Sequence, residues 1–224
     1  MNKYILIVVV AVVLMGGVWL YLSGSTAPKG VSLSDIPEVV ARVNGKDISG
    51  SDLANFEIQL ASGQGIDVAS LDGESRKQLQ TQALDALVSN MLLFQAATAL
   101  TITATEADVD AQMTTIKSQF QDDTEFEALL LAQGITEADV REQIAIDIVI
   151  QAYLVSTLDF DAITVTEAEI IAMYEQEASL VEDVPSLEEV TDQVEVFLVQ
   201  QKQQELLSAH IADLYADAEV EILI

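Results

Sequence analysis

The stretch VARVNGKDISGSDL, residues 40–53, decides the fold of this 224-residue chain. Apolar residues alternate on both sides of Asn44-Gly45, and Asn-Gly between two such runs is the strongest short-range signal for a β-hairpin. From Ser51 onward the spacing of apolar residues becomes helical. The stretch therefore predicts a two-stranded ribbon over residues 39–48 that leads directly into helices.

The far end of the chain supplies the only other strand pattern. Residues 218–224, AEVEILI, alternate between apolar and polar side chains. A single ribbon is only marginally stable in water, so the terminal strand is expected to join the hairpin. We therefore predict one domain over residues 38–224, with the helix and strand at 186–224 returning to its beginning.

Between these two ends the pattern is helical. A short helix capped by Ser49 or Ser51 is expected to run through Leu60. The stretch from about Glu74 to Leu100 repeats apolar residues at intervals of three and four, which predicts a long amphipathic helix.

Three later helices are predicted to begin with closely similar sequences. Thr105, Thr136 and Thr166 are each followed by an acidic residue three positions on, which is typical of a capping box. The segments after these residues differ from one another, so reuse of a good cap explains the similarity better than a repeat array does. Ser186 is expected to cap a last helix that reaches Tyr215.

The chain starts with a hydrophobic segment. Tyr4 to Leu22 is an uncharged run of 19 residues, long enough to cross a bilayer as a helix. A cleaved signal peptide stays open because the start is short and basic and small residues follow. Trp19 and Tyr21 fall where interfacial aromatic residues are expected, which favours an uncleaved anchor.

Residues 1–23 are therefore expected to be a transmembrane signal-anchor, and residues 24–37, rich in Ser, Gly and Pro, a linker. Lys3 precedes the span, so the positive-inside rule predicts a cytoplasmic N-terminus. The expected location is a single-pass protein of the cytoplasmic (inner) membrane, with its C-terminal domain extracytoplasmic or periplasmic.

The charge balance narrows the partners. The chain has 9 Lys and Arg against 37 Asp and Glu, a formal net charge of −28, and no Cys. Such a surface repels nucleic acid and anionic headgroups, so no nucleic-acid partner is expected. Solubility in a saline exterior explains the acidity better than a recognition surface for basic clients, although the latter stays open. Added salt is expected to stabilise the folded part.

Several segments in order resemble the SurA/PrsA-type extracytoplasmic chaperones. VARVNGKDISGSDL resembles their opening strand, turn and helix start. The later segments are similar to their helices and final strand: ALDALVSNMLLFQAATALTITATEADVDA, GITEADVREQIAIDIVIQAYL and PSLEEVTDQVEVFLVQQKQQELLSAHIADLYADAEVEIL. The resemblance covers nearly everything from Val39 onward and implies a mostly helical chaperone module of the SurA N-terminal type.

One departure from the family matters. Many members carry a parvulin prolyl-isomerase domain between the helices that start here at Thr166 and Ser186, whereas this chain has only EASLVEDVPS there. The chain also has one His and no Cys, so nothing fits a parvulin centre. The resemblance therefore implies the chaperone module without the isomerase, and we expect no enzymatic activity.

Client binding would need apolar side chains on a rigid frame, where many sequences bind weakly through burial. Packing of the helices against one another is the alternative role for the same side chains. The candidate client-binding residues are Met91, Leu92, Phe94, Met113, Ile116, Phe120, Phe126, Leu129 and Leu130.

Groups that could carry chemistry are few. His210 lies near the apolar face of its predicted helix without a second His, so no catalytic role is expected. The acid pairs Asp122-Asp123, Glu182-Asp183 and Glu188-Glu189 lack a calcium-loop pattern and are expected at solvated helix ends. No nucleotide, metalloprotease or hydrolase motif occurs. We expect no catalytic residue, metal or cofactor.

These observations predict a membrane-anchored holdase that binds unfolded or exported polypeptides without ATP. Its partners would be those clients and, through the N-terminal helix, the inner membrane. A scaffold subunit with one dedicated partner is the first alternative, and a prolyl isomerase with an unrecognised centre is the weaker second. Formation of a homodimer stays open.

Overall fold

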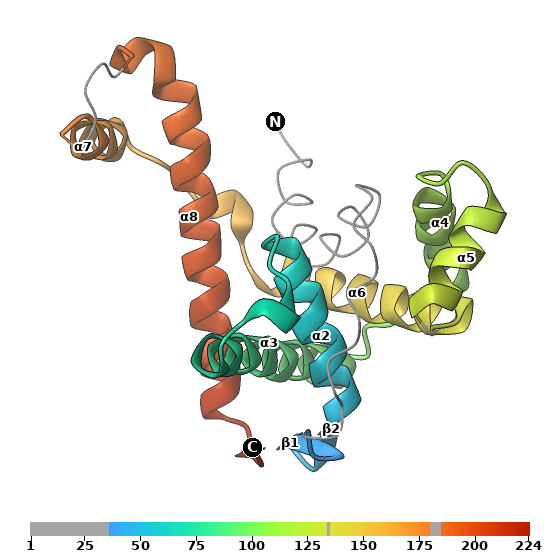
Figure 1. Ribbon diagram of the computed structural model, residues 1–224. Helices are drawn as coiled ribbons and strands as arrows, with labels where there is room; N and C mark the ends of the chain where they lie inside the picture. Colours follow the sequence, from blue (N-terminus) through green and yellow to red (C-terminus); the bar gives the residue numbers. More distant parts are fainter. Residues whose placement is uncertain (1–35, 134, 180–184) are drawn as a thin grey trace. The chain divides into compact units, whose positions relative to one another are not determined.

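The computed structural model describes residues 36–133, 135–179 and 185–224. Within these ranges the chain forms seven α-helices, two short 3-10 helices and one three-stranded sheet (Figure 1). In chain order the elements are β1 (Val39–Val43), β2 (Lys46–Ser49), α2 (Gly50–Gly63), η2 (Val68–Ser70), α3 (Gly73–Ala99), α4 (Glu106–Lys117), α5 (Asp123–Gln133), α6 (Glu137–Thr157), η3 (Phe160–Ala162), α7 (Glu167–Ala178), α8 (Leu187–Ala216) and β3 (Val220–Ile222). The mostly helical fold with a small sheet is confirmed. The predicted membrane segment and nearly all of the linker lie outside the described residues.

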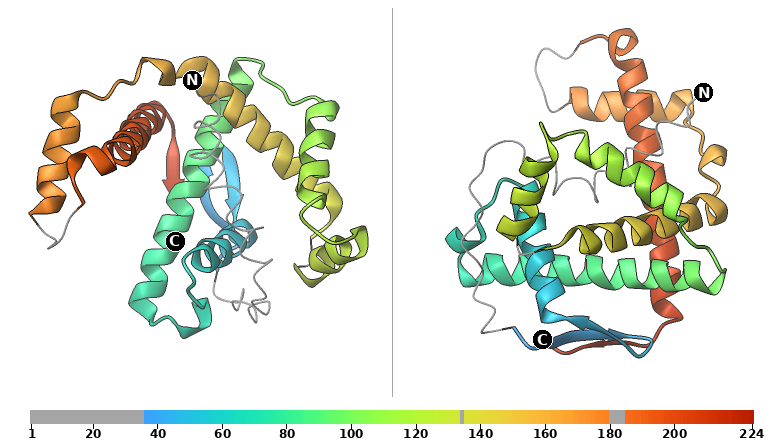
Figure 2. Two further views of the ribbon diagram at one scale, coloured as in Figure 1. Left: turned by 90° about the horizontal axis from the view of Figure 1, so that it is seen from above. Right: turned by 90° about the vertical axis from the view of Figure 1, so that its right-hand side faces the viewer.

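The sheet brings residues from the two ends of the described chain together. Its strand order is β2-β1-β3, and both pairings are antiparallel. Asn44 and Gly45 have positive φ angles of 50° and 78°, as an Asn-Gly hairpin turn requires. The N–H of Leu223 donates to the carbonyl of Val40 at 2.9 Å. Figure 2 shows the red terminal strand beside the blue hairpin, which confirms the predicted sheet.

The buried face of the sheet packs with α2 and α3. Ala41 and Val43 of β1 are fully buried, whereas Arg42 between them is exposed, as the alternation of a strand requires. The buried members of this core are Val40, Ala41, Val43, Ile48, Leu53, Ala83, Leu84, Val88 and Leu92. The long helix predicted from Glu74 is confirmed, with Asp72 as its N-cap.

The start of α2 is fixed by close packing. Ser49 caps the helix in a capping box with Asp52, which selects Ser49 over Ser51. The N–H of Gly50 donates to the carbonyl of Glu38 at 2.9 Å. A Cβ atom at Gly50 would overlap the carbonyl oxygen of Pro37, so only glycine fits here.

A buried ion pair joins α2 to α3. The Glu57 side chain is 0% exposed, and its carboxylate accepts from Arg76 Nε at 3.1 Å and Gln80 Nε2 at 3.3 Å. Removal of Arg76 or Gln80 would leave the buried Glu57 carboxylate without full compensation, which would lower the stability of the fold. This pair therefore fixes the two helices in register.

The helices α4, α5 and α6 form a second core. Thr105 and Thr136 cap α4 and α6, and each hydroxyl accepts from the N–H three residues on, which confirms both predicted caps. The buried members of this core are Val109, Met113, Phe126, Leu130 and Ile144. The helices that follow the Thr105, Thr136 and Thr166 caps have 12, 21 and 12 residues.

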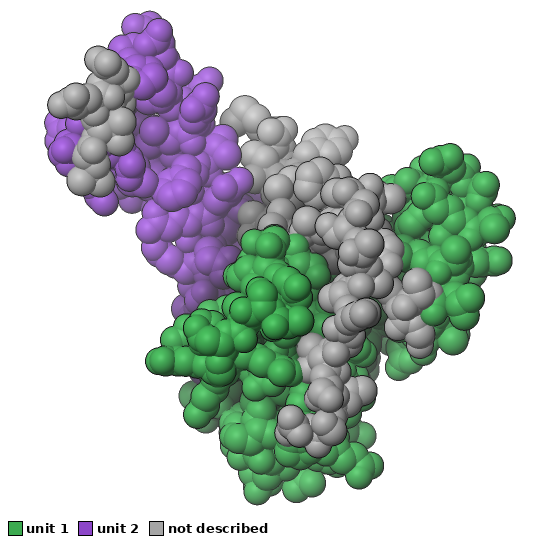
Figure 3. Space-filling model, in the orientation of Figure 1, with its two compact units in different colours: residues 1–153, 214–224 green, residues 154–213 purple. Residues whose placement is uncertain are grey.

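The chain divides into two compact units (Figure 3). The first comprises residues 1–153 and 214–224, and the second residues 154–213. The sheet and both cores described above belong to the first unit. The predicted domain at 38–224 includes nearly all described residues of both units.

The second unit, residues 154–213, contains a single basic side chain of the Lys or Arg type, which is Lys202. The Lys202 Nζ atom donates to the carbonyl of Thr164 at 2.7 Å and pairs with the Glu169 carboxylate at 2.6 Å. The same carboxylate caps α7 through Thr166, as predicted. The start of α8 after Ser186 is also confirmed, since the Ser186 hydroxyl and N–H both donate to Glu189.

Candidate functional site

The nine candidate client-binding residues fall into two groups in the first unit. Met91, Leu92 and Phe94 lie on α3, and the other six lie on α4, α5 and the turn between them. Met91 and Leu92 belong to the core beneath the sheet. All of the second group except Leu129 belong to the second core.

The group on α3 is mostly committed to packing. Leu92 is only 3% exposed and lies in the core beneath the sheet, and Met91 packs against the same core. Phe94 is half-buried. In this conformation Leu92 stabilises the fold, and only Met91 and Phe94 offer part of their surface to a client.

The group on α4 and α5 shows the same division. Met113, Phe126 and Leu130 are buried in the second core. Ile116 and Phe120 pack against that core while part of each side chain stays accessible, and Leu129 is half-buried. The rings of Phe120 and Phe126 form an edge-to-face pair with centroids 5.3 Å apart. The role of all nine residues in client binding stays a prediction.

Charged groups frame this second core. Lys117 Nζ lies 5.2 Å from the centre of the Phe126 ring and 3.0 Å from the Glu137 carboxylate. Arg141 of α6 pairs with Glu106 and Asp110 of α4, and the hydrogen bonds that its guanidinium donates to Asp110 and Glu106 raise the pKa of Arg141. These ion pairs tie α4 to α6 around the apolar side chains.

Other apolar side chains are more exposed than any candidate. Within the part of the chain that the structure describes, the large hydrophobic residues that face solvent are Leu100, Leu131, Val155, Val196, Phe197, Tyr215, Ile222, Leu223 and Ile224. Leu131 on α5 is 83% exposed, and Phe197 on α8 is 49% exposed. Sequence reasoning missed all nine.

The sequence does contain a signal for the exposure of Leu131, Val196 and Phe197. Leu129, Leu130 and Leu131 are consecutive, and successive residues of a helix point about 100° apart. All three therefore cannot face one core, and the structure exposes Leu131. The run Val196-Phe197-Leu198-Val199 on α8 is exposed in part for the same reason.

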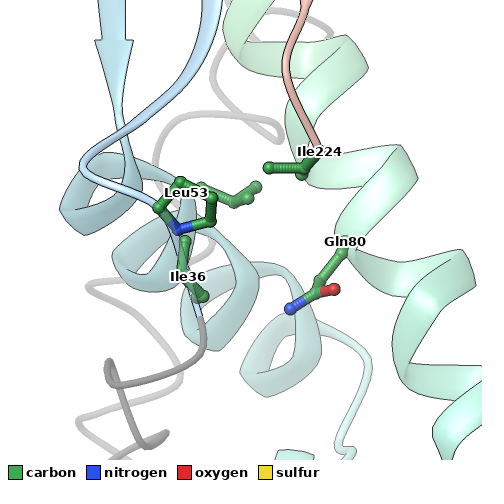
Figure 4. A pocket seen from close by; sticks show the side chains of 5 residues that line it. Ile36, Leu53, Gln80 and Ile224 are labelled. Atoms are coloured by element: carbon green, nitrogen blue, oxygen red, sulfur yellow. The ribbon is translucent and has the colours of Figure 1, made fainter.

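A small pocket opens in the first unit beside the end of β3 (Figure 4). Its volume is about 250 Å³, and it is lined by Ile36, Pro37, Leu53, Gln80 and Ile224. Figure 4 shows Ile36 and Leu53 on one side and Gln80 and Ile224 on the other. The lining side chains are mainly apolar, and none of them is an acid or a base.

The described residues hold no group of three or more His, Asp or Glu with metal-binding geometry. Two of the three acid pairs lie at helix starts, as expected. Asp122 accepts from the N–H of Glu125 before α5, and hydrogen bonds from Ser186 lower the pKa of Glu189 at the start of α8. The third pair, Glu182-Asp183, lies outside the described residues. His210 is half-buried on α8.

Over residues 36–133, 135–179 and 185–224, no helix combines the length and the apolar character that crossing a membrane requires. The predicted anchor at Tyr4–Leu22 lies outside these ranges, so this finding does not bear on it.

Comparison with protein families gives one match. The SurA-like N-terminal domain matches residues 1–154, more than half of the chain, and no parvulin domain is detected. The matched range includes the hairpin, α2 to α5 and nearly all of α6. A comparison with curated proteins gives no match.

Proposed function

The chain belongs to the SurA-like N-terminal domain family, and from this premise we propose that it is an ATP-independent holdase for unfolded or exported polypeptides. The family suggests a chaperone-type role. Binding of clients through apolar helical surface is the finer step that we add.

The observation that carries this proposal is the exposure of large apolar side chains on the helices. Leu131 is 83% exposed on α5, and Val196 and Phe197 are 44% and 49% exposed on α8. Burial of apolar surface contributes roughly 25 cal/mol per Å², so several such contacts hold a client weakly and without a unique fit. The half-buried candidates Met91 and Phe94 on α3 would offer further apolar contacts to a client.

The acidic surface supports the same proposal. With a net charge of −28, copies of the chain repel one another, which keeps a protein with exposed apolar side chains dispersed. The same charge favours clients with basic segments. A holdase needs exposed apolar side chains together with repulsion between its own copies, because it must bind apolar segments of clients without aggregating itself.

The place of action is part of the proposal. The uncharged run Tyr4–Leu22 and the basic Lys3 before it support a single-pass anchor in the inner membrane with a cytoplasmic N-terminus. The matched domain would then meet clients on the extracytoplasmic side as they emerge.

Site-specific photocrosslinking tests the proposal. The full chain in lipid nanodiscs carries a benzophenone amino acid at Leu131 or Phe197, and an unfolded secreted or outer-membrane protein is added without nucleotide. The exposed polar positions Glu127 and Gln193 on the same helices serve as controls. We expect crosslinks to several unrelated unfolded proteins from the two apolar positions and few from the controls.

Equal crosslinking from apolar and polar positions would contradict binding through the apolar surface. Capture of one protein alone, at a fixed stoichiometry, would instead support a scaffold subunit with a dedicated partner. A prolyl isomerase is disfavoured because no parvulin domain is detected.

A further inference from the structure

The strand β3 (Val220–Ile222) lies at an edge of the sheet, since the strand order is β2-β1-β3. Among the described residues, β1 is the only strand that pairs with it. Such an edge presents backbone N–H and C=O groups that can pair with another extended chain.

The register shows which groups are free to do so. Asn44 donates to the carbonyl of Glu219 at 2.8 Å, and the N–H of Leu223 donates to Val40 at 2.9 Å. In an antiparallel ladder, residues bonded to one neighbour alternate with residues that point the other way. Val220 and Ile222 therefore direct their N–H and C=O groups away from β1, toward the open edge.

The two faces of this edge differ in chemistry. Val220 packs against the core beneath the sheet, and Ile222 and Ile224 follow on the same face, 45% and 53% exposed. Ile224 also lines the pocket shown in Figure 4. On the opposite face, Glu219 and Glu221 are exposed, and Arg42 reaches the Glu221 carboxylate at 3.4 Å.

Charge decides between two occupants of this edge. A second copy of the chain that paired β3 with β3 would set Glu219 and Glu221 against the same acids, which is unfavourable for cross-strand neighbours. An extended segment with apolar residues on one face and Lys or Arg on the other would contact Ile222 and Ile224 and neutralise the two acids.

We propose that the open edge of β3 binds an extended client segment of alternating apolar and basic residues as a fourth strand. This inference rests on the proposed function and says how one part of a client is held. Val220 and Ile222 offer two N–H and two C=O groups, so the contact is short and reversible. That is the behaviour a holdase needs.

Backbone-methylated peptides test this edge without altering the protein. The probe is a fluorescein-labelled peptide of alternating Lys and Val, added to the full chain in lipid nanodiscs, with binding followed by anisotropy. One version carries N-methyl groups on the Val residues and another on the Lys residues. In a bound strand, the N–H groups of alternate residues point to opposite sides. Either the Val N–H groups or the Lys N–H groups can therefore donate to β3, but not both.

We expect one methylated version to lose at least about tenfold in affinity and the other to bind within about twofold of the parent, since methylation removes the donors of only one set. Equal affinity of both versions, absence of parent binding at millimolar concentration, or binding of a Glu-Val peptide as tight as that of the Lys-Val peptide would each overturn the inference. A dimer through β3 that excludes the peptide would also overturn it.

The variant Ile222→Pro separates this inference from the proposed function. Proline removes the N–H of residue 222, which points to the open edge and makes no bond to β1. The Glu221→Gln variant is milder, because it removes only the negative charge of one side chain. We expect both to weaken binding of the Lys-Val peptide. If both variants bind the peptide and protect unfolded clients as well as the unaltered chain does, the edge is not a client site, although the holdase proposal stands.

Discussion

Asn44 and Glu219, 175 residues apart in the chain, bond to each other twice. The Asn44 N–H donates to the Glu219 carbonyl at 2.8 Å, and the Glu219 N–H donates to Asn44 Oδ1 at 2.9 Å. The Asn44 amide also donates to Gln95 of α3 at 2.8 Å. One turn residue therefore connects the hairpin, the terminal strand and the long helix.

Replacement of Asn44 by Ala is expected to destabilise the fold. The variant loses the side-chain hydrogen bonds of Asn44 to Gln95 and to the Glu219 N–H, and alanine tolerates a positive φ less well than asparagine does. We therefore expect a loss of about 1–3 kcal/mol in the free energy of unfolding. Urea unfolding of the full chain in nanodiscs measures it. Asn55→Ala on the exposed side of α2 is the matched control and should be nearly neutral. Equal effects of the two substitutions would contradict the role of Asn44.

Gly50→Ala should be more damaging than an alanine substitution normally is at a helix start. The added Cβ would overlap the Pro37 carbonyl oxygen, and the backbone must shift to make room. We expect a loss of about 2 kcal/mol or more by the mechanism of overpacking. Gly73→Ala at the start of α3 is the control, because a Cβ there meets open space. A Gly50→Ala variant that melts with the parent would show that this contact is not tight.

Asp147 on α6 predicts a pH-dependent effect. Burial raises the pKa of its carboxyl to about 6, while the Gln143 amide that donates to it at 2.8 Å acts in the opposite direction. The folded-state pKa of Asp147 thus lies above its ordinary value of 3.8. The folded state holds the proton more tightly, so the associated stability is present below that value and is lost as the pH rises through about 6.

The variant Asp147→Asn mimics the protonated form. Near pH 8 it should be more stable than the parent by about 1–2 kcal/mol, since the side chain keeps some contact with solvent, and the difference should vanish near pH 4. Thermal melts at both pH values measure this. Glu142→Gln, an exposed acid on the same helix, controls for the change in net charge. A stabilisation that is the same at both pH values would contradict the assignment.

Salt should stabilise the chain. Its 37 acidic residues face only 9 Lys and Arg, and screening weakens the repulsion among them. We expect the melting temperature to rise by about 2–5 °C between low salt and about 0.5 M NaCl. Screening also weakens ion pairs such as Lys202–Glu169, so a fall would mean that these pairs outweigh the general repulsion.

Local signals in the sequence predicted most of the fold. The caps at Thr105, Thr136 and Thr166 are confirmed because each depends on a side chain that bonds the backbone three residues away. The Asn44-Gly45 turn is confirmed because these two residues tolerate the positive φ angles that it requires. The joining of β3 to the hairpin is predicted for a different reason. A terminal strand needs a partner, and the hairpin at residues 39–48 carries the only other strand pattern in the sequence.

The candidate surface was predicted less completely. An apolar stripe does not say whether a helix packs against its neighbours or faces solvent, and Phe126, a client candidate, is 2% exposed because α4 and α6 cover it. Leu131 faces solvent, and the sequence signals only that the three consecutive leucines 129–131 cannot all face one core. Tertiary packing decides which of the three is exposed.

Suppression of aggregation tests the central claim most directly. The full chain in nanodiscs is added to an unfolded secreted or outer-membrane protein without nucleotide, with empty nanodiscs as the control, and light scattering is followed. We expect scattering to fall in proportion to the added protein, and a variant with Leu131→Ser and Phe197→Ser to protect less. Scattering that is unchanged at stoichiometric amounts, at low and at high salt, would contradict the holdase function.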